Sequence, residues 1–316
     1  MQLHNHKEEF ETIVKAVAEE YGLRNFQVEK DYYVSLFLKE LNNLESNVQV
    51  VFKGGTSLSK CYDVIDRFSE DIDLAVNFNS NKVTQGQRRR LKKDILKIVE
   101  TLDMELLNPE DVQSRRDHNE YYVGFSNRFE IEQSTVPFII VETIVVYKPF
   151  PVKDLEVSNY ITKYLTRNDR TDLIKQYNLE PFKMPIQTIE RTFIDKSFAI
   201  CDYHLQEKYD RYSRHIYDLH KIWTSKLINE KLMRSILDDV IRDRQMFGRQ
   251  NISCEPGKNP QLILNEIIVK NPYKEDYDSV TTTFIHKKVM YDECMESIKD
   301  IYNQKILPTR IKNYSD

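Results

Sequence analysis

The feature that most constrains the fold is a β-branched segment that runs into two adjacent glycines, VVFKGGTSLSK at residues 50–60. The chain has only seven glycines in 316 residues, so the pair Gly54-Gly55 marks a position where the backbone needs freedom from Cβ. The pattern predicts a short strand over 48–53 and a short helix from about Thr56 to Val64. A strand, a tight turn and a helix start present backbone N–H groups to which an anion such as phosphate can bind.

This glycine turn is a weak signal when taken alone. The chain contains neither the Walker pattern GxxxxGK[ST] nor the dinucleotide pattern GxGxxG at this point, which excludes both of those phosphate loops. Thr56 and Ser57 would add hydroxyl donors for a phosphate. The same residues would also serve as the N-cap of a purely structural helix.

A pair of aspartates strengthens the case for a phosphate site. Asp71 and Asp73 are two residues apart in DIDLAVN (71–77), which alternates as a strand does, so both carboxylates point to one face. Their Cα atoms would lie about 6–7 Å apart, which suits Mg²⁺ shared with phosphate oxygens, with Mn²⁺ as an alternative. Ile72, Leu74 and Val76 should be buried on the opposite face. A strand end carrying two solvated acids is the simpler alternative.

A third carboxylate lies further along the chain. Glu142 sits in FIIVETIVV (138–146), a run that is apolar on both faces and predicts a central, buried strand. A buried carboxylate needs a partner, and a metal ion shared with Asp71 and Asp73 would supply one. Alternatively, Glu142 marks a half-exposed strand or pairs with a lysine.

The element order predicts a mixed α/β (α+β) fold. Helical spacing covers residues 6–22, 26–43 and 84–104, and further strands are expected over 120–126 and 138–147. The region 149–187 is punctuated by prolines, and from 188 onward the patterns are mainly helical. We therefore expect a mixed sheet with flanking helices over 1–165 and a mainly helical domain over 166–316.

Composition excludes several classes of protein. Apolar residues make up 40% and charged residues 30% of the chain, which is typical of a soluble globular protein. We expect a cytoplasmic protein, because there is neither a membrane-length apolar run nor a signal-peptide pattern. The four cysteines form no metal-ligand pair. Net charge is −4, so nucleic-acid contact would need a local patch such as the basic run at 88–93, which can equally be a solvated helix face.

Taken together, KGGTSLSK (53–60) and RFSEDIDL (67–74) resemble the AbiEii/AbiGii toxin family of the DNA polymerase β-like nucleotidyltransferase superfamily. VEKDYYVS (28–35), ERTFIDK (190–196) and RYSRHIYDLHKI (211–222) are similar to its other motifs, so the resemblance covers most of residues 26–225. It implies a nucleotidyltransferase core with a double-glycine turn at 54–57, a metal pair at Asp71 and Asp73, and a third metal ligand at Glu142.

The two downstream motifs also make sense from their spacing. Lys196 and Asp218 are nearly equidistant from a polar turn near 206–209, so in an antiparallel helix hairpin they would face each other. An interhelical salt bridge alone would explain this pairing. Arg214 lies one turn before Asp218 on the same face. The resemblance implies that Lys196 and Arg214 contact the nucleotide and that Asp218 completes the catalytic site, by orienting the acceptor hydroxyl or acting as a base.

The resemblance implies a toxin of a toxin-antitoxin or abortive-infection system. Its expected reaction moves a nucleoside monophosphate from a nucleoside triphosphate to an acceptor hydroxyl, in particular a tRNA 3′ end, with Mg²⁺ as cofactor and a cognate antitoxin as partner. Two alternatives stay open at this point. One is nucleotidyl or phosphoryl transfer to a protein side chain, and the other is a nucleotide-binding regulator without turnover.

Overall fold

The computed structural model describes residues 2–69, 71–78, 82–131, 135–247 and 250–314. The chain forms two compact units. The first comprises Met1–Cys61 and Phe68–Ile186, and the second comprises Tyr62–Arg67 and Gln187–Asp316. The short segment 62–67 therefore belongs to the second unit, although the first unit flanks it in the sequence on both sides.

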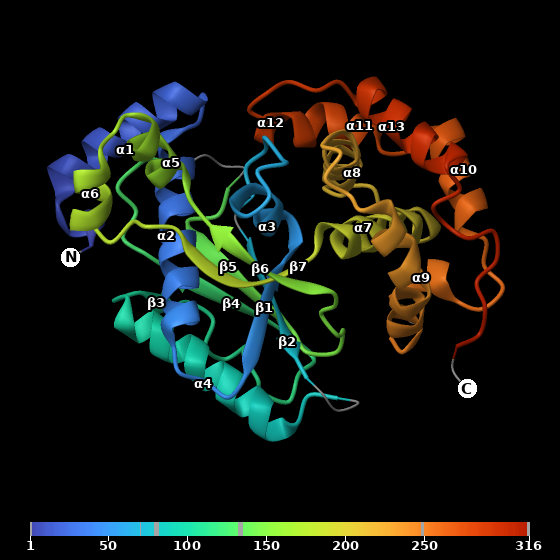
Figure 1. Ribbon diagram of the computed structural model, residues 1–316, viewed down its shortest axis with the longest axis horizontal. Coiled ribbons are helices and arrows are strands. Elements are labelled where there is room, and N and C mark those ends of the chain that lie inside the picture. Colours follow the sequence, from blue (N-terminus) through green and yellow to red (C-terminus); the bar gives the residue numbers. More distant parts are fainter. Residues whose placement is uncertain (1, 70, 79–81, 132–134, 248–249, 315–316) are drawn as a thin grey trace. The chain divides into compact units, whose positions relative to one another are not determined.

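A mixed sheet forms the framework of the first unit (Figure 1). Its strands are ordered β3-β4-β5-β2-β1-β7-β6. Strand β2 pairs antiparallel with β1 and parallel with β5, and β5 pairs antiparallel with β4. The strands are β1 (Gln49–Lys53), β2 (Asp71–Asn77), β3 (Glu105–Leu106), β4 (His118–Gly124), β5 (Phe138–Ile144), β6 (Val152–Val157) and β7 (Phe182–Gln187).

The two faces of strand β2 differ in burial: one is apolar and buried, and the other is polar and partly exposed. Ile72, Leu74 and Val76 are at most 1% exposed, as predicted, whereas Asp71 and Asp73 on the other face are partly exposed. This alternation fixes the register of β2, because a slip by one residue would bury both carboxylates and expose the apolar side chains.

The helix after the double glycine starts earlier than predicted. Helix α3 (Gly54–Lys60) begins at the first glycine, with Lys53 as its N-cap in extended conformation. Gly54 has φ +77°, a left-handed conformation that side chains disfavour. Thr56 and Ser57 consequently lie inside the helix and not at its cap.

Helices cover the sheet of the first unit. Helix α2 packs against α1, α4, α5 and β5, and α1 also packs against α5 (Figure 1). The proline-punctuated region 149–187 supplies α5 and α6 as well as strands β6 and β7. The helices of this unit are η1 (Leu3–Asn5), α1 (Lys7–Tyr21), α2 (Asn25–Asn43), α3, α4 (Gln85–Thr101), α5 (Tyr160–Arg167) and α6 (Thr171–Gln176).

A buried ion pair ties three of these helices together. Lys60 at the end of α3 is 5% exposed and pairs with Asp31 of α2, and its Nζ also donates to Ser35 Oγ at 2.7 Å. The second carboxylate oxygen of Asp31 accepts a hydrogen bond from the backbone N–H of Tyr160 in α5, at 3.0 Å. Asp31 thus fixes the helix that carries the double glycine.

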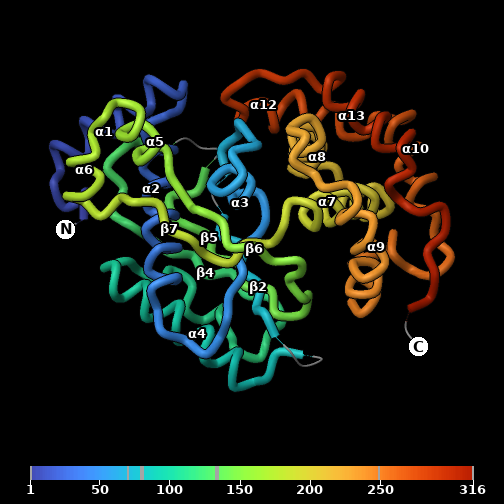
Figure 2. Tube along the Cα trace, viewed as in Figure 1, coloured from blue at the N-terminus to red at the C-terminus, as the bar shows by residue number. Residues whose placement is uncertain are grey.

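The second unit is mainly helical, as predicted (Figure 2). Helix α7 packs against α8, α9 and α10, and α13 packs against α8 and α10. The fold class is therefore confirmed as a mixed sheet with helices followed by a mainly helical region. The elements are α7 (Ile189–Leu205), α8 (Arg214–Thr224), α9 (Glu230–Gln245), η2 (Ile252–Cys254), α10 (Pro260–Lys270), α11 (Lys274–Asp276), η3 (Tyr277–Thr281), α12 (Thr282–Phe284) and α13 (Tyr291–Asn303).

The basic run at residues 88–93 lies on α4, and some of its side chains make contacts within the first unit. Arg89 and Lys93 are exposed, which fits a solvated helix face. Three other members contact the first unit itself: Arg88 pairs with Asp117, Arg90 pairs with Asp94, and Lys92 donates to the carbonyl of Val112. None of the helices in the described ranges combines the length and apolar character that crossing a membrane requires.

Replacing Asp31 should destabilise the first unit strongly. In Asp31→Asn the ammonium of Lys60 stays buried without a counter-charge, which costs about 3–5 kcal/mol. The double variant Asp31→Asn/Lys60→Met removes the buried cation and should recover part of that loss. Urea unfolding of both variants and of Lys60→Met tests this, and equal stability of Asp31→Asn and the wild type would contradict it.

Candidate active site

The double glycine and the acid pair meet where β1 runs into α3. Lys53, the last residue of β1, is paired with Asp73 in the antiparallel ladder. A Cβ built on Gly54 would overlap the Asp73 carboxylate. The carboxylate of Asp73 therefore occupies the space that the glycine side chain leaves empty. The predicted closeness of the acid pair to the double glycine is confirmed for Asp73.

Carboxylates line up across three neighbouring strands. Asp73 of β2 is opposite Glu142 of β5, and Glu142 is opposite Glu120 of β4. Opposed residues share a face of the sheet, on strands that lie about 4.7–4.9 Å apart. Asp71 lies two residues before Asp73 and so shares this face. We call these four residues the acid row.

Strand β5 is interior, as predicted, but it is not buried on both faces. Ile139 and Val141 are fully buried, whereas the Glu142 side chain is 27% exposed. The prediction that β5 is buried on both faces is wrong, because the face that carries the acid row is partly exposed. The alternative of a half-exposed strand is correct, and His118 is one of the side chains that contact Glu142.

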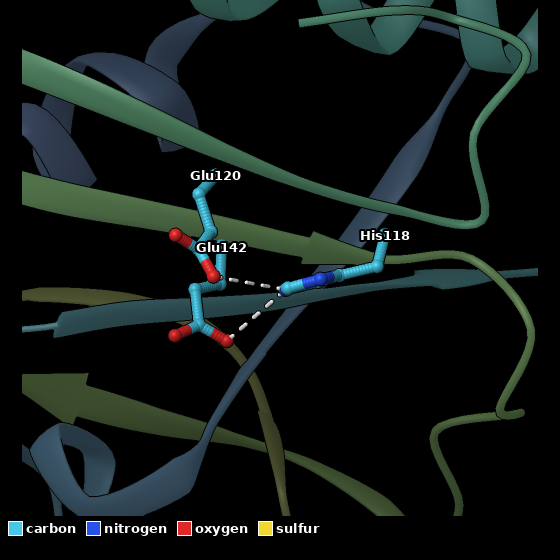
Figure 3. Close-up of side chains that lie close together, drawn as sticks. All are labelled: His118, Glu120 and Glu142. Carbon is cyan, nitrogen blue, oxygen red and sulfur yellow. Dashed lines mark ion pairs between the residues drawn. The ribbon is translucent and has the colours of Figure 1, made fainter. Parts of the chain in front are cut away.

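His118 at the start of β4 points between two members of the acid row (Figure 3). Its Nε2 lies 3.5 Å from Glu142 Oε2 and 3.9 Å from Glu120 Oε1. The hydrogen bond to Glu142 raises the pKa of His118 above its usual value; partial burial opposes this rise, and the charges of Glu142 and Glu120 support it.

The residue types of the acid row suit a divalent cation. Like charges opposite each other in a sheet repel, and a cation that binds carboxylate oxygens would offset this repulsion. Asp71, Asp73 and Glu142, the three predicted ligands, share one face on adjacent strands. Within the described part of the chain, a group with three potential ligand atoms all within 4.8 Å of one another is formed by His118, Glu120 and Glu142.

The predicted helix hairpin of the second unit brings Lys196 and Asp218 together. Lys196 Nζ of α7 lies 2.8 Å from Asp218 Oδ2 of α8. Asp218 is fully buried and also accepts two hydrogen bonds of 2.7 Å from the guanidinium of Arg67. The geometric prediction is confirmed, and the salt-bridge alternative describes the contact itself. The catalytic assignments of Lys196 and Asp218 stay predictions.

Arg67, Lys196 and Asp218 form a buried group that we call the Asp218 triad, and the pKa values of Lys196 and Asp218 are shifted. Burial alone would raise the pKa of Asp218, but the charges of Arg67 and Lys196 outweigh it and hold that pKa well below the usual range. Burial lowers the pKa of Lys196, against the attraction of Asp218. Asp218 is accordingly a weak base in this setting.

Aromatic rings adjoin the triad. His215 Nδ1 lies 3.3 Å from Lys196 Nζ, and burial, with Lys196 nearby, lowers the pKa of His215 well below its usual value. The His215 ring is nearly parallel to those of Tyr203 and Tyr212, which stack with centroids 3.7 Å apart. A neutral His215 can accept a hydrogen bond from Lys196 and help to hold its ammonium in place.

The other predicted nucleotide-binding residues differ in exposure. Ser57 is fully buried and donates its hydroxyl hydrogen to the carbonyl of Gly54 at 2.8 Å, and Thr56 hydrogen-bonds Ser69 at 2.8 Å. Arg214 is exposed. The hydroxyls that were expected to face a phosphate thus contribute to the structure of the turn, and their role as ligands stays a prediction.

Three residues that complete these groups were not singled out from the sequence. They are Arg67, Glu120 and His118. Arg67 stood inside the quoted motif RFSEDIDL without an assigned role. Glu120 alternates with buried Asn119 and Tyr121 in the way Asp73 alternates with Ile72 and Leu74, so a search for acids on predicted strands could have found it.

Substituting Gly54 should be far more harmful than substituting another left-handed glycine. Gly54→Ala adds a clash with Asp73 to the backbone strain, so we expect a loss of stability above the strain of about 1 kcal/mol alone. Gly22 has φ +65° and nothing within 4 Å of an added Cβ, so Gly22→Ala is the matched control. Thermal unfolding compares them, and equal losses would contradict the contact with Asp73.

The Asp218 triad should make stability depend on acid pH. Because the pKa of Asp218 is lowered by folding, its contribution is fully present above the unfolded-state pKa of about 4 and is lost as pH falls below that value. Asp218→Asn should cost about 3–5 kcal/mol at pH 7 and less at pH 3. Denaturant unfolding at both values measures this, and a cost independent of pH would argue against the charge interaction.

Comparison with known protein families agrees with this arrangement. The family described as "Nucleotidyl transferase AbiEii toxin, Type IV TA system" matches residues 36–295, which include the double glycine, the acid row, Lys196 and Asp218. No curated protein matches the chain. The match spans most of the chain, so this protein belongs to the AbiEii family of nucleotidyltransferase toxins of type IV toxin-antitoxin systems.

Proposed function

We propose that this nucleotidyltransferase transfers a nucleoside monophosphate from a nucleoside triphosphate to the 3′ end of a tRNA, which blocks translation and growth. The observation that carries the proposal is the contact between the Asp73 carboxylate and the backbone of Gly54. It brings a carboxylate that we propose as a metal ligand next to a backbone segment without side-chain bulk, which suits a metal-triphosphate complex. The choice of tRNA rests on the family resemblance.

Asp71, Asp73 and Glu142 would hold the divalent ion, Mg²⁺ by preference and Mn²⁺ as the alternative. When bound, such an ion stabilises charge on the reacting phosphates and makes an oxygen nucleophile more acidic. In the reaction, the acceptor hydroxyl oxygen forms a bond to the α-phosphorus, the bond to pyrophosphate breaks, and the hydroxyl proton is released.

The chain's own residues bind and position the nucleotide. Gly54 and Gly55 allow the phosphate oxygens to approach the backbone closely. Lys196 and the exposed Arg214 offset the charge of the triphosphate. Asp218 is fully buried and held by two cations. We therefore assign it the role of positioning Lys196 and not that of a base.

The biological setting follows from the same proposal. The toxin acts in the cytosol, where nucleoside triphosphates and tRNA are available. A cognate antitoxin counteracts it there. We expect no membrane among its partners.

Removing either aspartate should abolish activity. The experiment incubates the purified chain with Mg²⁺, total tRNA and each α-labelled nucleoside triphosphate in turn. Asp71→Asn and Asp73→Asn should lose about 10²–10³-fold or more of the incorporation and should no longer inhibit growth. Asp154→Asn, at an exposed aspartate of β6 in the same sheet, is the matched control and should keep both activities.

The same assay separates the alternative functions. Unchanged incorporation by Asp73→Asn would refute the metal assignment. Label that appears on added protein and not on tRNA would indicate a protein acceptor. Triphosphate binding without release of pyrophosphate would indicate a regulator without turnover.

A further inference from the structure

A cluster of nitrogen and oxygen ligands overlaps the acid row at the start of β4. It consists of His118, Glu120 and Glu142, and we call it the His118 cluster (Figure 3). One potential ligand atom of each side chain lies within 4.8 Å of the other two. The side chains of His118, Glu120 and Glu142 are 48%, 40% and 27% exposed, so an ion can reach them from solvent.

The spacing of these atoms is close to that of metal ligands. Bonds of about 2.0–2.2 Å at a roughly tetrahedral angle place two ligand atoms about 3.4 Å apart. His118 Nε2 is 3.5 Å from the Glu142 oxygen and 3.9 Å from the Glu120 oxygen. Small side-chain rotations would therefore bring all three onto one ion, with the strand positions unchanged.

A neighbouring tyrosine orients one of the carboxylates. The hydroxyl of Tyr122 donates to Glu120 Oε2 at 2.9 Å, so the other oxygen, Oε1, is the one near His118. The Tyr122 ring in turn stacks on Phe138 with centroids 4.8 Å apart. Such hydrogen bonds to a ligand's second atom are typical of metal sites, where they fix the orientation of the ligand.

The ligand types decide which ion fits. Mg²⁺ is a hard cation that prefers oxygen ligands, whereas imidazole nitrogen suits first-row transition metals. We propose that the His118 cluster binds a divalent transition-metal ion, separate from the ion that Asp71 and Asp73 hold. Glu142 belongs to both groups and places the second ion next to the nucleotidyl-transfer site. The ion neutralises the charge that accumulates along the acid row.

The test uses Mn²⁺ with the full chain and reads the ligands by pulsed electron paramagnetic resonance. A histidine ligand gives the bound Mn²⁺ a ¹⁴N coupling, which an oxygen-only site lacks. The wild type should show this coupling in excess Mg²⁺, and His118→Gln should lose it. Tyr122→Phe should keep the coupling and weaken Mn²⁺ binding about 10–100-fold. His6→Gln, at a histidine in α1's N-cap position, is the matched control and should keep both.

The result does not depend on whether the chain transfers nucleotides. Asp73→Asn should keep the ¹⁴N coupling even though it should fail in the transfer assay, so the two proposals can fail separately. A wild type without the coupling would overturn the His118 cluster as a metal site and leave a surface ion pair in its place. Coupling that persists in His118→Gln would overturn it as well.

Discussion

The architecture of the site depends on one close contact, that of the Asp73 carboxylate with the backbone of Gly54. The antiparallel pairing of β1 and β2 sets Lys53 opposite Asp73, and the missing Cβ at the next residue makes room for the acid. A side chain at position 54 would displace the Asp73 carboxylate. The start of α3 and the position of the Asp73 carboxylate thus depend on the same few atoms.

Charged side chains on the open face of the sheet are arranged differently from those in the interior of the two units. On the open face of the sheet, acids are concentrated on neighbouring strands, an arrangement that favours capture of cations. Elsewhere, charges are buried and paired: Asp31 with Lys60 in the first unit, and Asp218 with Arg67 and Lys196 in the second. Buried pairs of this kind specify geometry more than they add stability. They hold the elements that carry the residues proposed to bind the nucleotide.

Local periodicity predicted the parts of the site that lie within one element. The two-residue repeat of β2 placed Asp71 and Asp73 on one face, and equal spacing from a turn paired Lys196 with Asp218. Those predictions needed only strand and helix geometry.

The parts that were missed depend on long-range pairing. Glu120 joins Glu142 only through the β4–β5 register, which no short window of sequence reveals. The predicted strand 120–126 began two residues too late, and this placed His118 in a loop. Arg67 reaches Asp218 across 151 positions of the chain, a pairing that no helix or strand period can indicate.

The segment Tyr62–Arg67 belongs to the second unit although the first unit flanks it in the sequence, and this has a consequence for synthesis on the ribosome. Arg67 emerges 151 residues before Asp218, and at about 5–20 residues per second the delay is roughly 8 to 30 seconds. Until then the guanidinium has no carboxylate from α8, and residues 62–67, which precede β2, cannot reach their native surroundings. The buried contact of Arg67 with Asp218 can therefore form only after α8 has been synthesised.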